Sequence, residues 1–99
     1  MKQMDDVTQK IDFIVTLLKK YGATRISLFG SYARGENHQG SDMDVLVEFK
    51  DTITLIDLSH IILLVKEETG LKLDVVTKNA ISPYLALYIE KDLQVLYSV

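Results

Sequence analysis

The sequence predicts a single α/β domain, residues 1–99, in which helices pack against a mixed β-sheet. Two observations support this class. Segments with the three- and four-residue apolar spacing of helices alternate with short apolar runs typical of strands, and glycines punctuate them. A chain of 99 residues also has room for only one core of ordinary size. The expected order is helix, strand, turn, strand, helix, strand, helix and a short final strand, while the pairing order stays open.

The first third of the chain predicts a helix, a strand and a tight turn. Gly22 suits the position just past the helix, and the run 25–29 before Gly30 is typical of a strand. Residues 31–34 have room for one helical turn, and 35–40 have the composition of a loop. The apolar stripe of the expected helix consists of Val7, Ile11, Ile14, Leu18 and Tyr21.

The middle of the chain predicts a second strand over residues 42–49, followed by a second long helix. Thr54, with Asp57 three residues later, resembles the capped start of a helix, and an acid is favourable in that first turn. Gly70 is suited to end the helix. Its expected stripe comprises Leu55, Leu58, Ile62 and Val65.

The last third predicts a strand, a helix and a short final strand. Residues 71–77 are a run of strand-forming residues. Ser82 and Pro83 are typical of an N-cap and first helical residue, so we expect a helix from there to about residue 92. Residues 93–97 are then expected to add the final strand.

Composition points to an interaction surface but argues against nucleic acid as the partner. Hydrophobic residues make up 47% of the chain and the mean hydropathy is +0.13, more apolar side chains than a small core can hide. We therefore expect a protein partner, a second copy or a different chain. The net charge of -3 and pI near 5.2 are the opposite of a phosphate-binding basic footprint, so direct nucleic-acid binding is not expected.

The chain contains no cysteine, which excludes disulfides and thiolate metal sites and leaves oxygen or imidazole ligands for any metal. The N-terminal residues lack the apolar segment of a signal peptide. The longest apolar run, residues 61–65, is far too short to span a bilayer. We expect a cytoplasmic protein that is not bound to a membrane.

Two acids on the second predicted strand are the strongest indication of chemistry. Side chains alternate along a strand, so Asp42 and Asp44 should share a face with Cα atoms roughly 6.7 Å apart. At an effective dielectric of about 20, two such charges repel by roughly 2.5 kcal/mol, which favours a bound cation. Gly30 and Ser31 precede them in a turn where backbone and hydroxyl could approach a phosphate. Together these residues indicate metal-assisted phosphoryl or nucleotidyl transfer.

Asp74 could complete a set of three acids, because it interrupts an apolar strand and would otherwise require a structural explanation. Three carboxylates suit a pair of Mg²⁺ ions that also bind substrate phosphates and water. Asp74 would then help remove the proton of the attacking hydroxyl. The structural alternatives are an exposed edge strand or turn cap for the pair, and a salt bridge from Asp74 to Lys72 or Arg25.

Other polar residues support fewer conclusions. Arg34 could hold terminal phosphates in a bidentate manner, or it could simply pair with Glu36. His38 and His60 are expected to be solvated rather than catalytic, and Glu48 to lie on a solvated edge. The apolar run 61–65 could equally be core or interface. A phosphatase of the aspartyl-phosphate type and an EF-hand are both excluded by the residues around the acids.

The composite pattern resembles the signature of the nucleotidyltransferase superfamily related to DNA polymerase β, and the short chain resembles its minimal nucleotidyltransferase branch. This resemblance implies a mixed sheet flanked by helices. It also implies transfer of a nucleoside monophosphate, AMP from ATP, to a hydroxyl with release of pyrophosphate. The residues that carry the resemblance are Gly30 and Ser31, then Ala33-Arg34-Gly35 and Ser41, and Asp42-x-Asp44 after a ten-residue interval.

By that resemblance each site residue has an expected role. Asp42, Asp44 and Asp74 are implied to bind two Mg²⁺ ions and to be catalytic. Gly30 and Ser31 are implied to hold the nucleotide, and Arg34 and Ser41 are assigned to the same nucleotide site.

Minimal nucleotidyltransferases are similar to the antitoxin of HEPN/MNT toxin–antitoxin modules, which binds a helical HEPN ribonuclease and can adenylylate a tyrosine on it. The resemblance thus implies a HEPN-type toxin as partner. An alternative is a binding module that neutralises the toxin by occlusion while its catalytic site is vestigial. The apolar helix at 61–65 and the cluster around Tyr84 and Tyr88 motivate this alternative. Transfer to a small molecule would need an acceptor domain that the sequence does not show.

Overall fold

The computed structural model describes residues 6–38, 40 and 42–99 and contains a four-stranded mixed sheet with helices on both sides. The expected α/β class is confirmed. In chain order the elements are α1 (Val7–Lys20), β1 (Ala23–Phe29), α2 (Ser31–Arg34), β2 (Met43–Phe49), α3 (Leu55–Thr69), β3 (Leu73–Thr77), the 3-10 turn η1 (Lys78–Ala80), α4 (Pro83–Glu90) and β4 (Gln94–Ser98).

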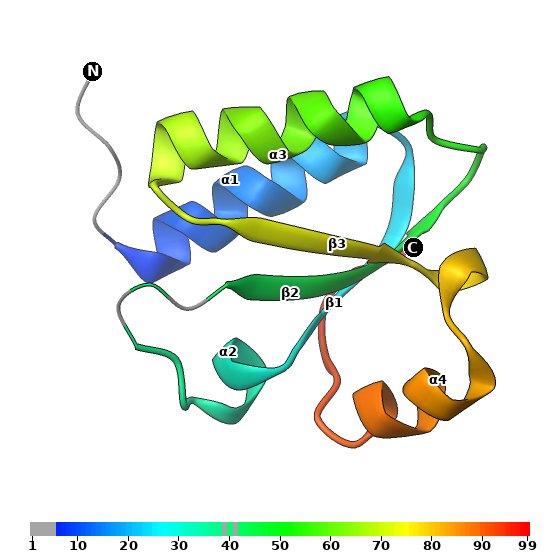
Figure 1. Cartoon of the computed structure of the whole chain (residues 1–99). Coiled ribbons are helices and arrows are strands. Elements are labelled where there is room, and N and C mark those ends of the chain that lie inside the picture. The colour runs from blue at the N-terminus through cyan, green and yellow to red at the C-terminus, as the bar shows by residue number, and fades with distance from the viewer. Residues whose placement is uncertain (1–5, 39, 41) are drawn as a thin grey trace.

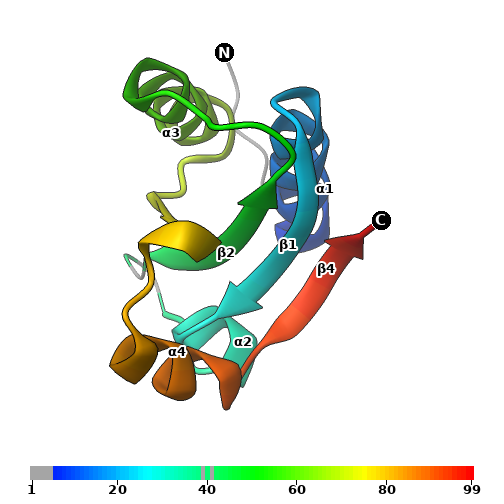
Figure 2. The ribbon, with the colours of Figure 1, turned by 90° about the vertical axis from the view of Figure 1, so that its right-hand side faces the viewer.

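The strand order is β3-β2-β1-β4. β1 lies antiparallel to both of its neighbours, whereas β2 and β3 run parallel because α3 carries the chain back between them. The long helices α1 and α3 cover one face of the sheet, and the short helices α2 and α4 lie on the other side (Figure 1). A view turned by 90° shows β4 beside β1 at one edge of the sheet (Figure 2).

The main core lies between the sheet and the two long helices. Alternate residues of β2 are buried there, as period-two patterning requires. α1 begins at the N-cap Asp6, whose side chain accepts a hydrogen bond from the Thr8 amide at 2.7 Å. The fully buried side chains of this core include Ile14 and Leu18 of α1, Ile26 of β1, Met43, Val45 and Val47 of β2, and Ile61 and Val65 of α3.

The expected apolar stripe of α3 was only partly correct. The start is as expected, since the Thr54 hydroxyl accepts a hydrogen bond from the Asp57 amide at 3.0 Å. The buried face, however, consists of Ile61, Val65 and Thr69, while Leu55 is 81% exposed. The helix is apolar around much of its circumference, so spacing alone could not identify the side that faces the core. The run 61–65 is therefore core on one side and surface on the other.

Most element boundaries agree with the sequence within two residues. β1 begins two residues earlier than expected, β3 begins two residues later, and α4 ends two residues earlier. The short turn η1 was not expected. β2 lies inside the sheet between β1 and β3, so the edge-strand alternative for its acids was wrong.

Candidate active site

The ends of three neighbouring strands bring the predicted site together. Asp44 of β2 lies opposite Phe29 of β1, so the turn at Gly30 follows directly beside it. On its other side, Asp44 is the register partner of Asp74 in the parallel ladder with β3. Asp44 and Asp74 are 30 residues apart in the sequence, yet they lie side by side. The glycine turn and these two acids therefore meet at one end of the sheet.

Gly30 occupies a position that only glycine can fill. Its backbone has φ 73° and ψ −152°, a region that is essentially restricted to glycine. A Cβ atom there would lie 2.5 Å from Oδ2 of Asp44. The turn thus approaches the carboxylate as closely as it does because no side chain intervenes, and Ser31 follows at the start of α2.

Asp44 is held in a strongly acidic environment. Burial, the charge of Asp74, hydrogen bonding to Asp74 and the charge of Asp42 raise the pKa of Asp44 from 3.8 to about 6, in that order of importance, and Arg34 opposes them. A carboxyl whose ionised form is disfavoured by its neighbours is a place where a cation would be favourable. The sequence predicted repulsion between Asp42 and Asp44, but burial and Asp74 raise the pKa of Asp44 more than Asp42 does.

The other two acids are more accessible. Asp42 lies just before β2 and is exposed, with the ammonium of Lys72 at 3.9 Å. Asp74 is also exposed. The cations considered as its structural partners are engaged elsewhere, Lys72 with Asp42 and Arg25 with Glu48 at 4.0 Å. The salt-bridge explanation for Asp74 therefore does not hold, and its partner is the carboxyl of Asp44.

This donor set suits Mg²⁺, which prefers oxygen ligands and commonly uses one or two carboxylates together with phosphate oxygens and water. Within the described part of the chain, no three His, Asp or Glu side chains already form a metal cage. Part of the coordination would therefore come from substrate and water.

A cleft of about 500 Å³ opens in front of Asp42 and Asp44, whereas Asp74, beside Asp44 on β3, is not among the residues that line it. It is lined by Phe29, Gly30, Ser31, Arg34, His38, Gly40, Asp42, Asp44 and Tyr88. Four of these residues were not among the predicted site residues, namely Phe29, His38, Gly40 and Tyr88. His38 had been assigned to solvent, and Tyr88 had been noted only as part of an apolar cluster. Phe29, His38 and Gly40 lie within a few residues of predicted site residues in the sequence, whereas Tyr88 reaches the cleft from α4 only through tertiary structure, which no local pattern could have revealed.

Arg34 lies at the cleft, but its guanidinium is paired within the protein. It contacts Glu36 at 2.9 Å and Asp92 at 3.3 Å, and hydrogen bonds to these two carboxylates raise its pKa. The pairing with Glu36 is the structural alternative considered from the sequence. Asp92, which follows α4, was not expected. Binding a phosphate would require Arg34 to exchange at least one of these partners.

The remaining predicted residues lie elsewhere. Ser41 is outside the described residues. Glu48 is far along β2 and forms ion pairs with Lys78 at 3.3 Å and with Arg25. It takes no part in the cleft, although it lies on an interior strand rather than a solvated edge. None of the helices described here is long and apolar enough to cross a membrane.

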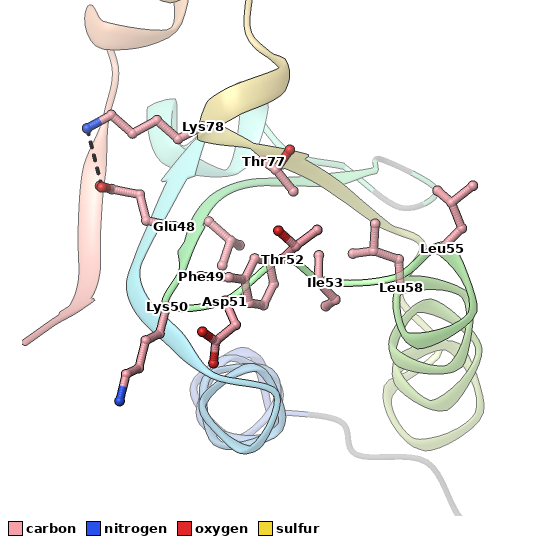
Figure 3. A pocket seen from close by; sticks show the side chains of 11 residues that line it. Glu48, Phe49, Lys50, Asp51, Thr52, Ile53, Leu55, Leu58, Thr77 and Lys78 are labelled. Carbon is pink, nitrogen blue, oxygen red and sulfur yellow. Dashed lines mark hydrogen bonds and ion pairs between the residues drawn. The ribbon is translucent and has the colours of Figure 1, made fainter.

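A second hollow, of about 410 Å³, lies at the opposite end of β2, near the start of α3 (Figure 3). Its wall combines apolar side chains such as Leu58 with the ion pair between Glu48 and Lys78, which Figure 3 marks by a dashed line. The carboxylate of Glu48 is thus already neutralised. The cleft at Asp44 is therefore the candidate active site.

Comparison with known proteins agrees with this geometry. The family model described as "Nucleotidyltransferase domain" matches residues 11–96. MJ0435 of Methanocaldococcus jannaschii, provisionally named a protein adenylyltransferase, is 44% identical over 72 residues, which are 73% of this chain and 77% of the relative. The protein adenylyltransferase MntA of Thermococcus cleftensis is 32% identical over 83 residues, 79% of this chain and 84% of the relative.

Solved structures show the same fold. A chain in a crystal structure of a toxin–antitoxin with AMP-PNP superposes with a TM-score of 0.79 at 25% identity, covering 90% of this chain and 73% of that one. The chain described here is homologous to the MntA-type adenylyltransferases, and it belongs to the nucleotidyltransferase domain family.

Proposed function

We propose that this protein is a Mg²⁺-dependent protein adenylyltransferase, which transfers AMP from ATP to a hydroxyl group of a partner protein. The observation that carries the proposal is the position of Asp44, between the glycine turn on one strand end and Asp74 on the next. Its raised pKa supports a cation-binding role. The protein-adenylyltransferase relatives support the choice of AMP and of a protein acceptor.

The residues divide into two groups. Gly30 and Ser31 would hold the phosphates, and Arg34 and Ser41 are assigned to the same nucleotide site. Asp42, Asp44 and Asp74 would hold two Mg²⁺ ions, and these ions would neutralise negative charge on the triphosphate.

In the reaction, the acceptor oxygen forms a bond to the α-phosphorus while the bond from that phosphorus to the β-bridging oxygen breaks. Pyrophosphate leaves, and Asp74 helps to accept the proton of the acceptor hydroxyl. Because the reaction consumes ATP, we place it in the cytoplasm.

The surface supports a protein partner. A set of large apolar side chains remains exposed on α3 and, on the other side of the sheet, on α4, and contact with other proteins would remove them from water. We propose a HEPN-type toxin as this partner, in a hetero-oligomer, since a similar fold occurs in a toxin–antitoxin structure with AMP-PNP. The most exposed members of the set are Leu55, Ile56, Leu63, Tyr84, Leu87 and Tyr88.

The test is transfer of label from α-labelled ATP to a co-expressed HEPN-like protein encoded beside this gene. We expect Mg²⁺-dependent labelling that Asp44→Asn abolishes. The matched control is Glu48→Gln, which neutralises an acid on the same face of the same strand but outside the cleft. Undiminished labelling by Asp44→Asn would contradict the proposal, as would equal loss in both variants.

The exposed apolar surface also favours a second function, neutralisation of the toxin by occlusion. Here the double variant Asp42→Asn/Asp44→Asn would still bind the partner and still protect cells from it. Retained binding with lost protection would exclude occlusion and leave adenylylation as the neutralising event.

A further inference from the structure

Tyr88 occupies an unusual place in the cleft. It lies on α4, yet it lines the same cavity as Gly30, Ser31 and Asp44. Its neighbour Ile89 is buried against the sheet with 2% exposure, whereas Tyr88 is 64% exposed. One residue corresponds to about 100° of helical rotation. Burial of Ile89 thus fixes the helix so that Tyr88 is presented to the cleft.

The position of α4 is also tied to the turn that would hold phosphates. Arg34 of α2 contacts Asp92, four residues beyond Tyr88, at 3.3 Å. This ion pair joins the segment after α4 to the last residue of α2, the short helix that follows the glycine turn. Two contacts, the burial of Ile89 and the ion pair of Asp92, therefore position the segment that carries Tyr88 beside the cleft.

The chemistry of a nucleotide matches this layout. If its phosphates lie at Gly30, Ser31 and the acids, its base must rest on another part of the wall. A base requires a flat apolar surface, which aromatic rings provide. Besides the imidazole of His38, which lies on the loop after α2, two aromatic residues line the described part of the cleft, Phe29 and Tyr88. Phe29 is half-buried within β1, whereas Tyr88 has an exposed ring.

We propose that Tyr88 is the base-stacking residue of the nucleotide site, with its ring against the face of the purine. The inference rests on the proposed function and extends it by assigning the wall that receives the base. Stacking on an aromatic ring contributes about 5- to 150-fold to the affinity for a base. The hydroxyl of Tyr88 is not required for this role.

The test measures equilibrium binding of ATP and of inorganic tripolyphosphate, which has the phosphates but no base, in the presence of Mg²⁺. We expect Tyr88→Ala to weaken ATP binding by about five-fold or more and to leave tripolyphosphate binding unchanged. Tyr88→Phe should stay within about two-fold of the wild type for both probes. In labelling assays Tyr88→Ala should raise the KM for ATP more than it lowers kcat.

The matched control is Tyr84→Ala. Tyr84 lies one turn earlier on the same helix, is 89% exposed and does not line the cleft, so ATP binding should not change. Unchanged ATP binding by Tyr88→Ala would overturn stacking while leaving the proposed function intact. A loss as large in Tyr88→Phe would assign the role to the hydroxyl, as acceptor or hydrogen-bond donor, and would also overturn it. Absence of ATP binding by the wild type would overturn both the proposed function and this inference.

Discussion

Replacing Asp44 by asparagine should make the metal-free protein more stable while it removes activity. In the folded protein, burial and the charges of Asp74 and Asp42 disfavour the ionised carboxyl and raise its pKa from 3.8 to about 6. Asparagine has nearly the same shape, carries no charge and can donate a hydrogen bond to Asp74. The substitution therefore removes a repulsion without leaving a cavity.

The magnitude follows from the two pKa values. The difference corresponds to about 3 kcal/mol at 1.36 kcal/mol per pH unit, and solvent screening at this half-buried site reduces it to about 1–2 kcal/mol. Because the pKa is higher in the folded state, the wild type incurs no cost from this carboxyl below about pH 3.8. The cost grows as the pH rises toward about 6 and stays constant above it.

Urea unfolding in the presence of a chelator measures this effect. At about pH 8 we expect the free energy of unfolding of Asp44→Asn to exceed that of the wild type by about 1–2 kcal/mol, with an unchanged m-value. At about pH 3 the two proteins should differ little, because the carboxyl is then largely protonated in both states. Glu48→Gln, which loses ion pairs instead, should gain no stability. Equal unfolding midpoints of wild type and Asp44→Asn at about pH 8 would refute the reasoning.

Three further predictions concern the same site. Mg²⁺ at 100 times its dissociation constant should stabilise the wild type by about 2.7 kcal/mol and should not stabilise Asp44→Asn. Thermal unfolding with and without Mg²⁺ measures this difference. Gly30→Ala should abolish ATP binding and lower the free energy of unfolding more than Gly35→Ala does. Both glycines have positive φ, but only a Cβ at Gly30 would meet another atom, Oδ2 of Asp44. ATP titration and urea unfolding of the two variants test the difference. Arg34→Gln should raise the KM for ATP roughly ten-fold with little effect on stability, because a charge-assisted phosphate contact is worth more than exposed ion pairs; equal KM values would assign Arg34 to structure alone.

Local patterns predicted the fold class and the positions of the elements well. Caps such as Thr54 and Ser82 depend on residues three positions apart, so the sequence displays them directly. The buried side of α3 could not be predicted in the same way. Its apolar residues encircle much of the helix, and contact with α1 and β3 rather than periodicity selects Ile61 and Val65.

The sequence predicted some residues of the site and not others. Gly30, Asp42 and Asp44 lie within one short segment, and the local pattern identified them. Asp74 was expected because an acid within an apolar strand is unusual, and the β2–β3 register places it next to Asp44. Tyr88 and Asp92 reach the site only because α4 packs back over the sheet, and no spacing in the sequence encodes that contact.

The parallel pairing of β2 with β3 has a consequence for how the protein folds. Leu73, next to Asp74, is buried, and a shift of one residue would place it on the site face and turn Asp74 into the core. Apolar burial therefore sets the alignment of the two strands, against the mutual repulsion of the acids that it brings together. The pairing also closes a loop that contains all of α3, so it is a non-local contact, which forms more slowly than the pairing of strands joined by a short turn. Because Asp44 and Asp74 are brought together only by this pairing, metal binding at the site would report that β2 and β3 are correctly aligned.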